Sequence, residues 1–336
     1  MTIKIAINGF GRIGRSVFRI LSRRDDMEVV AINDLFHNEA LAYLLKYDTI
    51  MGTFEKDVTY DEEYLHIGGQ KILMTKERDP AKAKWGELGV DVVVESTGVF
   101  RQRKQLEKHL DAGAKRVLLT VPPKDEIDAM VVYKVNDHIL KKEHRIISNA
   151  SCTTNCLAPV AHVLNDTFGI ESGLMTTVHA YTNDQRLADV PHADFRRSRA
   201  AAENIIPTTT GAAIAVGKVL PELAGKLDGM AARVPIPDGS IVDLTVKLNK
   251  KPSRDEINEA LRSAAHGALE GVLEYSTVPV VSSDIIGNPH SSIFDSLLTQ
   301  ARGDGYTRVM SWYDNEWGYS NRCVDLILKM HEIDNA

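Results

Sequence analysis

The sequence predicts an α/β fold with two domains: a doubly wound parallel sheet comes first, and an α+β domain with a mostly antiparallel sheet follows. Up to about residue 150, short apolar runs alternate with helix-like stretches, which is typical of a buried parallel sheet. Beyond that point the strand-like runs are longer, and fewer helices separate them. With 336 residues, the chain is also long enough for about two domains that each bury a core.

The chain opens with a strand, a glycine-rich turn and a helix. The strand is expected over residues 3–7 (IKIAI), the glycines Gly9, Gly11 and Gly14 have the spacing GxGxxG, and the helix follows over about residues 12–22. Gly9 would allow the tight turn, Gly11 would let the backbone approach a pyrophosphate, and Gly14 would let the helix pack on the strand. Taken alone, the glycines fit an ordinary strand-to-helix turn equally well.

A second strand and an acid favour the more specific interpretation. Residues 27–32 form an apolar run, and Asp34 follows it, 20 residues after Gly14. An acid at this place binds the ribose hydroxyls of a dinucleotide. The first domain is therefore predicted to be of the Rossmann type, with a pyrophosphate site at the helix N-terminus. Because Asp34 would repel a 2′-phosphate, we predict NAD rather than NADP as the cofactor.

The same alternation continues to residue 151, which we expect to be the end of the NAD-binding domain. In chain order, we expect a helix over residues 39–46, a hairpin over 64–73, a strand over 91–95, a helix over 102–112 and a strand over 116–120.

A cysteine at the start of a helix opens the second predicted domain, residues 152–317. Residues 149–156 (NASCTTNC) place polar side chains directly before Cys152. The unpaired backbone N–H groups and the dipole of a helix N-terminus favour a thiolate, so we expect a lowered pKa for this thiol. Such a cysteine is a candidate nucleophile.

The second domain then supplies a histidine. Strands are expected over residues 173–181, 229–234, 241–248 and 306–312. His179 lies in the first of them, and by itself it would be taken as a structural histidine. Together with an activated cysteine it is a candidate base, and a Cys–His ion pair would keep the thiol ionised. A last helix, in residues 318–336, is expected to pack back on the NAD-binding domain.

Composition narrows the class of protein. The formal charge of −6, from 40 basic and 46 acidic residues, argues against a nucleic-acid binder. No apolar run approaches the ~18 residues of a membrane span, and no secretory signal is expected at the N-terminus. Three cysteines do not make a disulfide framework, which indicates the reducing cytoplasm. No cluster of ligands supports a metal site, and Cys156 and Cys323 are expected to be buried side chains.

Several longer segments carry a resemblance to a known family. They are residues 8–15 (NGFGRIGR), 95–98 (ESTG), 148–159 (SNASCTTNCLAP), 179–185 (HAYTNDQ), 206–213 (IPTTTGAA) and 312–319 (WYDNEWGY). The chain resembles phosphorylating glyceraldehyde-3-phosphate dehydrogenase essentially from end to end. The resemblance implies an NAD-dependent oxidoreductase of glycolysis that converts glyceraldehyde 3-phosphate and inorganic phosphate into 1,3-bisphosphoglycerate. It also implies a cysteine thioester on Cys152, His179 as the base, and a homotetramer.

The resemblance further assigns binding residues. On the cofactor it implies Arg12 and Ile13 at the pyrophosphate, Arg78 and Thr97 near the adenine half, Thr120 beside the nicotinamide ribose and Asn315 on the carboxamide. For the phosphate of the substrate it implies Thr182, Arg197 and Arg233. For the attacking inorganic phosphate it implies Ser151, Thr153, Thr210 and Gly211.

Three departures from the usual family pattern keep alternatives open. Ile214 stands where a lysine is common beside the inorganic-phosphate loop, and Val121 and Lys134 replace the usual alanine and glycine. A specialised paralogue that uses arsenate as the acyl acceptor is therefore one alternative. Erythrose-4-phosphate dehydrogenase is a second, although relatives of that type tend to lose segments that this chain keeps. A non-enzymatic NAD-binding regulator is the third, and the presence of Cys152 and His179 argues against it.

Overall fold

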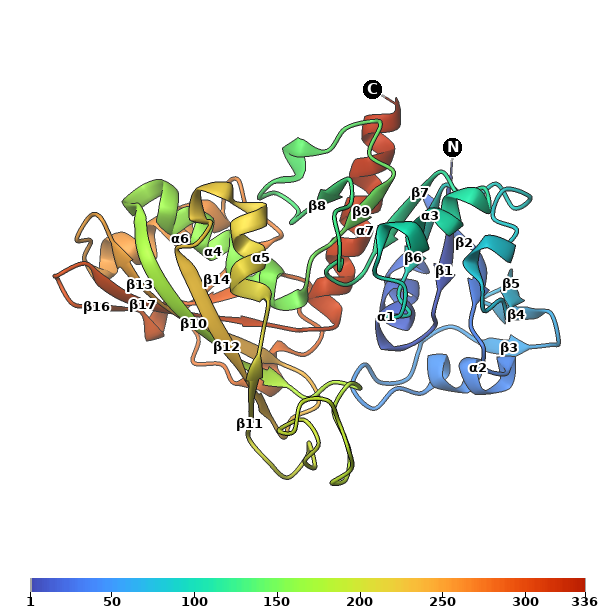
Figure 1. Cartoon of the computed structure of the whole chain (residues 1–336), viewed down its shortest axis with the longest axis horizontal. Coiled ribbons are helices and arrows are strands. Elements are labelled where there is room, and N and C mark those ends of the chain that lie inside the picture. The colour runs from blue at the N-terminus through green and yellow to red at the C-terminus, as the bar shows by residue number, and fades with distance from the viewer. Residues whose placement is uncertain (1, 336) are drawn as a thin grey trace. The chain divides into compact units, whose positions relative to one another are not determined.

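The computed structural model describes residues 2–335, which form two compact units that are described here one at a time (Figure 1). The first unit runs to Val131 and also contains Ile139–Ala150 and the segment from Ser320 onward. The second unit contains Val132–His138 and Ser151–Tyr319. The grouping of residues 132–138 with the second unit has no counterpart in the predicted boundary at residue 151. Lys134, in that segment, donates a hydrogen bond to the backbone oxygen of Glu270 in the same unit (2.8 Å).

Within residues 2–335, the first unit is built on a nine-stranded sheet with the order β3-β4-β5-β2-β1-β6-β7-β9-β8. The pairs from β5 to β8 are parallel, and β3, β4 and β5 pair antiparallel as a hairpin extension. The strands are β1 (Ile3–Asn8), β2 (Met27–Asn33), β3 (Val58–Tyr60), β4 (Tyr64–Ile67), β5 (Gln70–Thr75), β6 (Val92–Glu95), β7 (Arg116–Leu119), β8 (Ala129–Met130) and β9 (Ile146–Ser148).

The strand order reverses direction between β1 and β6. From β1 the chain moves outward to β2, whereas from β6 it moves the other way to β7. Because parallel crossovers are right-handed, the two connecting helices lie on opposite faces of the sheet. The helices of this unit are α1 (Arg12–Leu21), α2 (Asn38–Lys46), α3 (Arg103–Asp111) and, from Ser320 onward, α7 (Trp317–Asn335), with short 3-10 turns η1 (Pro80–Lys82) and η2 (Asp137–Ile139) near its connections. A nucleotide is expected beside the reversal, at the carboxyl ends of β1 and β6.

In the described part of the second unit, an eight-stranded sheet has the order β11-β12-β10-β13-β17-β15-β14, and β16 pairs with β17. Most of its pairs are antiparallel, and only β10–β12 and β14–β15 are parallel. The strands are β10 (Ile170–Ala180), β11 (Ile206–Thr209), β12 (Leu227–Val234), β13 (Ser240–Leu248), β14 (Leu273–Ser276), β15 (Ser292–Asp295), β16 (Gln300–Ala301) and β17 (Tyr306–Tyr313). The two sheets confirm the predicted fold class.

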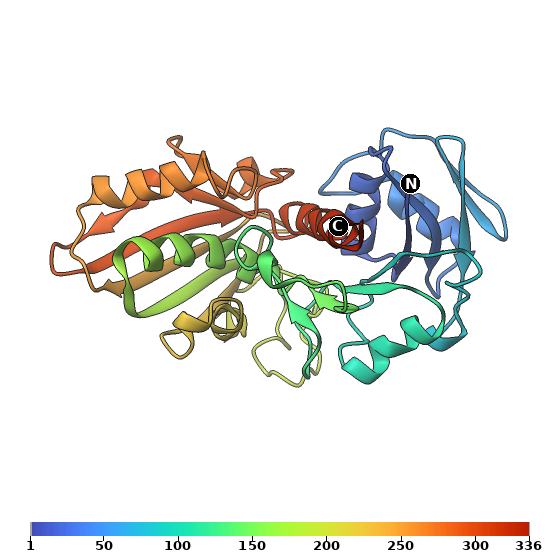
Figure 2. The ribbon, with the colours of Figure 1, turned by 90° about the horizontal axis from the view of Figure 1, so that it is seen from above.

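Helices α4 (Cys152–Phe168) and α6 (Arg254–Ala265) lie side by side on one face of this second sheet, and α5 (Ala212–Val219) packs against α4 and β12 (Figures 1 and 2). Short 3-10 turns complete the unit: η3 (Pro221–Leu223), η4 (Ser282–Ile285) and η5 (Ser296–Leu298). Part of the sheet surface is open. Leu174 on β10 and Tyr306 on β17 are 68% and 48% exposed, and they line a shared hollow of about 480 Å³.

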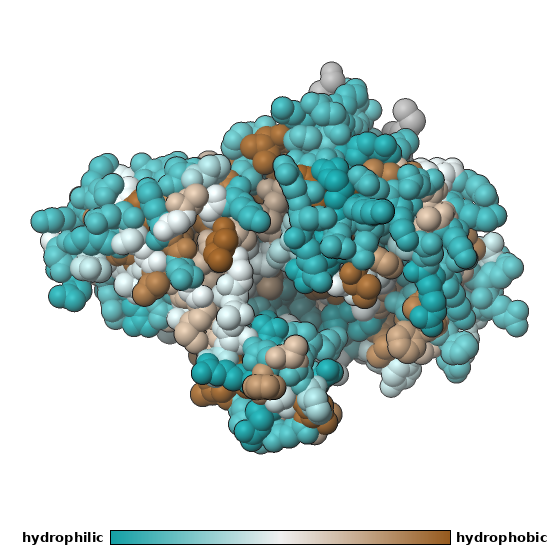
Figure 3. Space-filling view, in the orientation of Figure 1, coloured by the Kyte–Doolittle hydropathy of each residue, from teal (hydrophilic) through white to brown (hydrophobic). Residues whose placement is uncertain are grey.

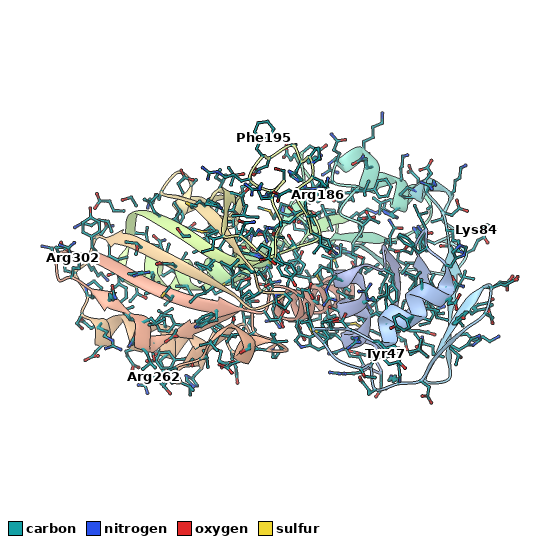
Figure 4. All side chains as sticks on the ribbon, turned by 90° about the horizontal axis from the view of Figure 1, so that it is seen from below. Tyr47, Lys84, Arg186, Phe195, Arg262 and Arg302 are labelled. Atoms are coloured by element: carbon teal, nitrogen blue, oxygen red, sulfur yellow. The ribbon has the colours of Figure 1, made fainter. Side chains whose placement is uncertain are left out.

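A long segment between β10 and β11 projects from the second unit, and its surface carries scattered apolar side chains (Figure 3). Leu187 and Phe195 are its most exposed apolar residues, at 86% and 87%. Phe195 points away from the ribbon in Figure 4. Among residues 2–335, no helix combines the length and the apolar character that a membrane span requires.

Candidate functional site

The glycine turn after β1 has the geometry that a phosphate cradle requires. Gly9 has φ +92°, and a Cβ placed on it would lie 2.7 Å from the backbone nitrogen of Thr97. A Cβ on Gly14 would lie 2.2 Å from the backbone oxygen of Gly9. Gly11, the N-cap of α1, faces open space, because a Cβ there would meet no atom within 4 Å. An anion can therefore reach the N-terminus of α1 at Gly11, while the other two positions admit only glycine.

Asp34 lies at the edge of a cavity of about 460 Å³ in the same unit. One carboxylate oxygen accepts a hydrogen bond from the backbone N–H of Phe10 (2.7 Å), and the other accepts one from Phe36 (3.1 Å). The cavity is lined by Asn8, Gly9, Asn33, Asp34, Leu35, Phe36, Glu77, Arg78, Thr97, Val99 and Phe100. Apolar walls, one cation and a half-buried acid fit the adenosine half of a dinucleotide, and the open glycine turn fits its pyrophosphate.

The other predicted cofactor residues of this unit lie around the same turn. Arg12 begins α1 and forms an ion pair with Asp48 (2.7 Å), and Ile13 follows it, half-buried. Thr120 follows β7, and both its backbone N–H and its hydroxyl donate to the backbone oxygen of Glu95 (3.0 and 3.1 Å). The structure thus gathers all of these residues at the carboxyl ends of the parallel strands.

In the second unit, Cys152 is the first residue of α4. Ser151 is the N-cap, and its hydroxyl accepts a hydrogen bond from the backbone N–H of Thr154 (3.1 Å). The Sγ of Cys152 lies 3.5 Å from Nε2 of His179, near the end of β10. A thiol and an imidazole in hydrogen-bonding reach, at a helix N-terminus, are the parts of a nucleophile with its base.

The other face of His179 is held by β12. Arg233 is the register partner of His179 on that strand, and its Nη1 lies 2.6 Å from Nδ1 of the imidazole. The backbone oxygen of Ala180 lies 2.7 Å from the same nitrogen and also accepts a hydrogen bond from Arg233 (3.0 Å). The ring of Tyr313 stands edge-on to the imidazole, with centroids 5.8 Å apart.

The surroundings of this pair oppose the expected ionisation. Burial raises the pKa of the Cys152 thiol to about 11, against the lowering effect of Arg233. Burial, followed by the charge of Arg233, lowers the pKa of His179 to about 3. Desolvation therefore acts against the helix N-terminus and favours a neutral thiol beside a neutral imidazole over an ion pair.

The predicted anion-binding residues form two groups in the second unit. Arg197 pairs with Asp184 (2.6 Å) and donates to the Thr208 hydroxyl (2.9 Å). Thr182 also bonds Asp184 through its hydroxyl. Arg197 and Thr182 thus share one carboxylate partner, whereas Arg233 lies against His179.

The second group lies at two helix N-termini. Ser151 and Thr153 begin α4, and Thr210 and Gly211 immediately precede α5, where the hydroxyl of Thr210 accepts the backbone N–H of Ala212 (3.2 Å). A Cβ on Gly211 would meet no atom within 4 Å. Both helix starts offer backbone N–H groups to an anion.

Asn315 is buried in the second unit, after β17. Its Oδ1 accepts a hydrogen bond from the hydroxyl of Ser240 (2.6 Å), which leaves the amide N–H₂ as the group available to a ligand.

Sequence reasoning gave no role to two residues that the structure places beside the predicted ones. The hydroxyl of Tyr313 bonds both Thr153 (2.9 Å) and Thr177 (2.8 Å), and so ties the start of α4 to β10. Asp184 is the shared partner of Arg197 and Thr182. Both residues occur in segments that carry the family resemblance, but no spacing rule predicts contacts over such sequence distances.

The remaining cysteines and the possible metal ligands lie elsewhere. Cys156 and Cys323 are buried, and neither they nor Cys152 form a disulfide in the part of the chain that the structure describes. Among the residues that the structure describes, His162, Asp166 and Glu222 bring possible ligand atoms within 4.8 Å of one another. Asp166 and Glu222 are exposed, and we assign no metal to them.

Comparison with known proteins gives consistent matches for both units. A family model described as glyceraldehyde 3-phosphate dehydrogenase, NAD binding domain, matches residues 3–103, and the one for the C-terminal domain matches residues 151–315. Glyceraldehyde-3-phosphate dehydrogenase of Mycobacterium tuberculosis is 56% identical over 334 residues, and that of Streptomyces coelicolor is 55% identical over 329. Glyceraldehyde-3-phosphate dehydrogenase 2 of Streptomyces avermitilis is 54% identical over 328 residues. Each match covers 97% of this chain and 98% of the relative.

Proposed function

The chain belongs to the glyceraldehyde-3-phosphate dehydrogenase family, and on that premise we propose that it converts glyceraldehyde 3-phosphate, NAD and inorganic phosphate into 1,3-bisphosphoglycerate and NADH. It is an NAD-dependent oxidoreductase that acts on an aldehyde. The observation that carries the mechanism is the contact between Sγ of Cys152 and Nε2 of His179 at the start of α4 (3.5 Å).

The first step is covalent capture of the aldehyde. Because burial disfavours the free thiolate, the thiol needs a base as it attacks. With Nδ1–H of His179 donating to the backbone oxygen of Ala180, Nε2 is the nitrogen that accepts the proton of Cys152. His179 then returns the proton to the former carbonyl oxygen, which gives a hemithioacetal on Cys152. The backbone N–H of Cys152 is one of the unpaired donors of the helix N-terminus, and it stabilises the negative charge that develops on this oxygen.

Oxidation turns the hemithioacetal into a thioester. Bound NAD would supply the hydride acceptor, and the glycine turn, Asp34, Arg78, Thr97 and Thr120 would hold it, with Asn315 at the carboxamide. His179 removes the hydroxyl proton as the hydride leaves, so the carbon is oxidised by two electrons. Inorganic phosphate then attacks the acyl carbon of the thioester. The carbon–sulfur bond breaks, the acyl phosphate forms, and His179 returns its proton to the leaving sulfur of Cys152.

Two phosphates need separate sites. We assign the phosphate of the substrate to Thr182, Arg197 and Arg233, because two cations and a hydroxyl would neutralise and orient it once it replaces Asp184 as the partner of Arg197 and Thr182. We assign inorganic phosphate to Ser151, Thr153, Thr210 and Gly211, because two helix N-termini supply N–H donors.

We further propose that the protein is a cytoplasmic homotetramer. All three cysteines are thiols rather than disulfides, which agrees with a reducing compartment. Leu187 and Phe195 on the projecting segment, and Leu174 and Tyr306 on the open sheet surface, are exposed apolar groups of the kind that subunit contacts bury.

The alternatives gain no support. The curated relatives reported above all carry the name glyceraldehyde-3-phosphate dehydrogenase, which does not favour an erythrose-4-phosphate dehydrogenase, an arsenate-using paralogue or a non-enzymatic regulator. Ile214, the departure nearest the inorganic-phosphate residues, is 63% exposed on the first turn of α5.

The test is NADH formation from glyceraldehyde 3-phosphate and NAD, measured without oxyanion, with phosphate and with arsenate. We expect phosphate-dependent turnover that Cys152→Ser reduces by at least about a thousandfold, because the nucleophile is lost. Cys156→Ala, which changes a buried thiol one helical turn away, is the matched control and should keep most of the activity. One equivalent of NADH per site regardless of the oxyanion would contradict the phosphorylating half of the reaction.

A further inference from the structure

Four polar residues end the four adjacent strands of the first sheet at one level. Asn8 on β1 is in register with Asn33 on β2 and with Glu95 on β6, and Asn33 is in register with Thr75 on β5. Asn8, Asn33 and Glu95 are 1%, 5% and 0% exposed. A buried polar row at the carboxyl ends of parallel strands lies directly beneath a nucleotide site.

Side-chain hydrogen bonds connect this row without a break. The hydroxyl of Thr75 donates to Oδ1 of Asn33 (2.8 Å), and Nδ2 of Asn33 donates to Oδ1 of Asn8 (2.7 Å). Nδ2 of Asn8 then donates to Oε2 of Glu95 (2.5 Å). Every bond in the row donates toward Glu95, whose carboxylate accepts and cannot donate.

Two aromatic residues reach the same carboxylate from the opposite direction. The indole N–H of Trp85 donates to Nδ1 of His109 on α3 (3.1 Å), and Nε2 of His109 lies 3.0 Å from Oε2 of Glu95. Because Nδ1 accepts, the proton that satisfies both contacts is on Nε2, and the imidazole is neutral. Trp85 and His109 are both fully buried.

The other oxygen of Glu95 holds the wall of the cofactor cavity. Oε1 accepts the backbone N–H of Thr97 (2.9 Å) and also its hydroxyl. The backbone of Thr97 in turn closes over Gly9, with less room than a Cβ needs. Thr97, Gly9, Asn8 and Asn33 all line the 460 Å³ cavity, but His109 and Trp85 do not.

Burying the carboxylate of Glu95 costs more free energy than burying an apolar side chain in the same place. A carboxylate with no cation bonded to it loses its hydration on burial, and only the hydrogen bonds from Asn8, His109 and Thr97 compensate for that loss. An apolar group of similar volume would fill the same space at lower cost. What the buried carboxylate does in return is to hold the backbone of Thr97 against the glycine turn.

We propose that His109, backed by Trp85, is a positioning residue for the adenosine half of NAD. It touches neither cofactor nor substrate and acts through Glu95, whose orientation fixes Thr97, Asn8 and, through Asn8, the end of β2 that leads to Asp34. The proposal rests on the proposed use of NAD. It predicts that a change at His109 alters the affinity for NAD but not the reaction at Cys152, which lies in the other unit.

The test is calorimetric titration of the cofactor-free protein with NAD and with ADP-ribose, for wild type and His109→Phe. Phenylalanine keeps a planar ring but makes neither hydrogen bond. We expect both dissociation constants to rise by about fivefold or more, because the carboxylate loses one of its donors. The KM for NAD should rise equally, while kcat and the KM for glyceraldehyde 3-phosphate stay near wild type.

The matched control is Leu106→Ala on the same helix. Leu106 is fully buried against Val117, Leu119 and Ile146, so its truncation loosens α3 without touching the polar row. Equal weakening of NAD binding by Leu106→Ala would show a merely structural role and overturn the proposal. Unchanged NAD binding by His109→Phe would overturn it as well.

Two conservative variants keep the proposal testable if His109→Phe folds poorly. His109→Gln can donate to Glu95 and accept from Trp85, so it should regain part of the lost affinity. Trp85→Phe removes only the indole donor to His109 and should weaken NAD binding less than His109→Phe does. The same variant also identifies the fluorescence of Trp85, as the difference between its emission spectrum and that of wild type. That signal should change in cofactor-free His109→Phe, and no change would contradict the hydrogen bond. If wild type itself fails to bind NAD, the proposed function fails rather than the role of His109.

Discussion

At the scale of single residues, Arg233 puts a positive charge directly against the base. Its Nη1 lies 2.6 Å from Nδ1 of His179, and after burial its charge is the next cause that lowers the pKa of His179 to about 3. Because we also assign Arg233 to the phosphate of the substrate, an anion bound there would offset this charge. The structure thus links substrate binding to the strength of the base.

This link gives a pH-dependent prediction for Arg233→Leu, assayed with unphosphorylated glyceraldehyde so that phosphate binding is not measured. Removing the cation raises the pKa of His179 toward its ordinary value. The base must be neutral to act, so a raised pKa moves the acid limb of kcat/KM to higher pH. The pH–rate profiles of wild type and variant are the measurement, and an acid limb that stays in place would contradict a role for Arg233 in setting this pKa.

Sequence alone predicted that Cys152 and His179 act together, because a polar cap before a cysteine and a histidine on a later strand are recognisable by residue type, and the structure places the two side chains within 3.5 Å of each other. The ion pair that the sequence predicted for them is not the ionisation that their surroundings favour. That property depends on burial and on Arg233, which lies 54 residues beyond His179 and meets it only through the pairing of β10 with β12. The polar row from Thr75 to Glu95 was not predicted either. Each of its residues is simply the last residue of a strand, and only the register of the strands shows that they are neighbours.

At the scale of elements, Asp128 joins α3 to β9 in the first unit. Its carboxylate accepts hydrogen bonds from the guanidinium of Arg103 (2.5 Å) and from the backbone N–H groups of Arg145 and Ile146 (2.7 and 2.8 Å). Burial by itself would raise the pKa of Asp128, but these bonds outweigh it and lower the pKa below the ordinary value.

We therefore expect Asp128→Asn to reduce the free energy of unfolding by about 1–2 kcal/mol at pH 7, as charged hydrogen bonds of a partly exposed group are lost. A depressed folded pKa stabilises the fold above the unfolded pKa, and this contribution disappears as the pH falls through the folded value. When the pH is lowered from 7 to below about 4, the free energy of unfolding of the variant should thus fall by less than that of wild type. Denaturant unfolding at several pH values measures this, with Asp111→Asn, an exposed carboxylate on α3, as the control. Parallel pH curves for Asp128→Asn and wild type would contradict it.

Elements with a strong local pattern were predicted well. The strands β1, β2 and β6, the hairpin of β4 and β5, and the helices α1, α3 and α4 are confirmed close to their expected bounds. Helix α6 was missed, although Ser253 and Glu256 form a capping box that is visible in the sequence. The strands β8 and β16 were missed for a different reason, because a strand of two residues has no measurable period.

At the scale of the whole molecule, the open sheet surface of the second unit gives a prediction about assembly. Wild type should sediment at about four times its chain mass of 37.2 kDa. Leu174→Asp places a charge among exposed apolar groups, so it should lower the sedimenting mass, because burying an unpaired charge opposes association. Leu297→Asp, on an apolar residue that is 44% exposed in η5, serves as the control. A wild-type mass of a single chain would contradict the proposed tetramer.

The first unit is assembled from both ends of the chain. Arg116 forms an ion pair with Asp334, 218 residues away, and Asn149 donates to Sγ of Cys323 (3.3 Å). On the ribosome, the strands of this unit emerge first, yet the helix that completes it is made last. The intervening second unit is fully synthesised before the NAD-binding unit can close. The earliest part of the chain must therefore wait, with apolar surface uncovered, until α7 has been synthesised.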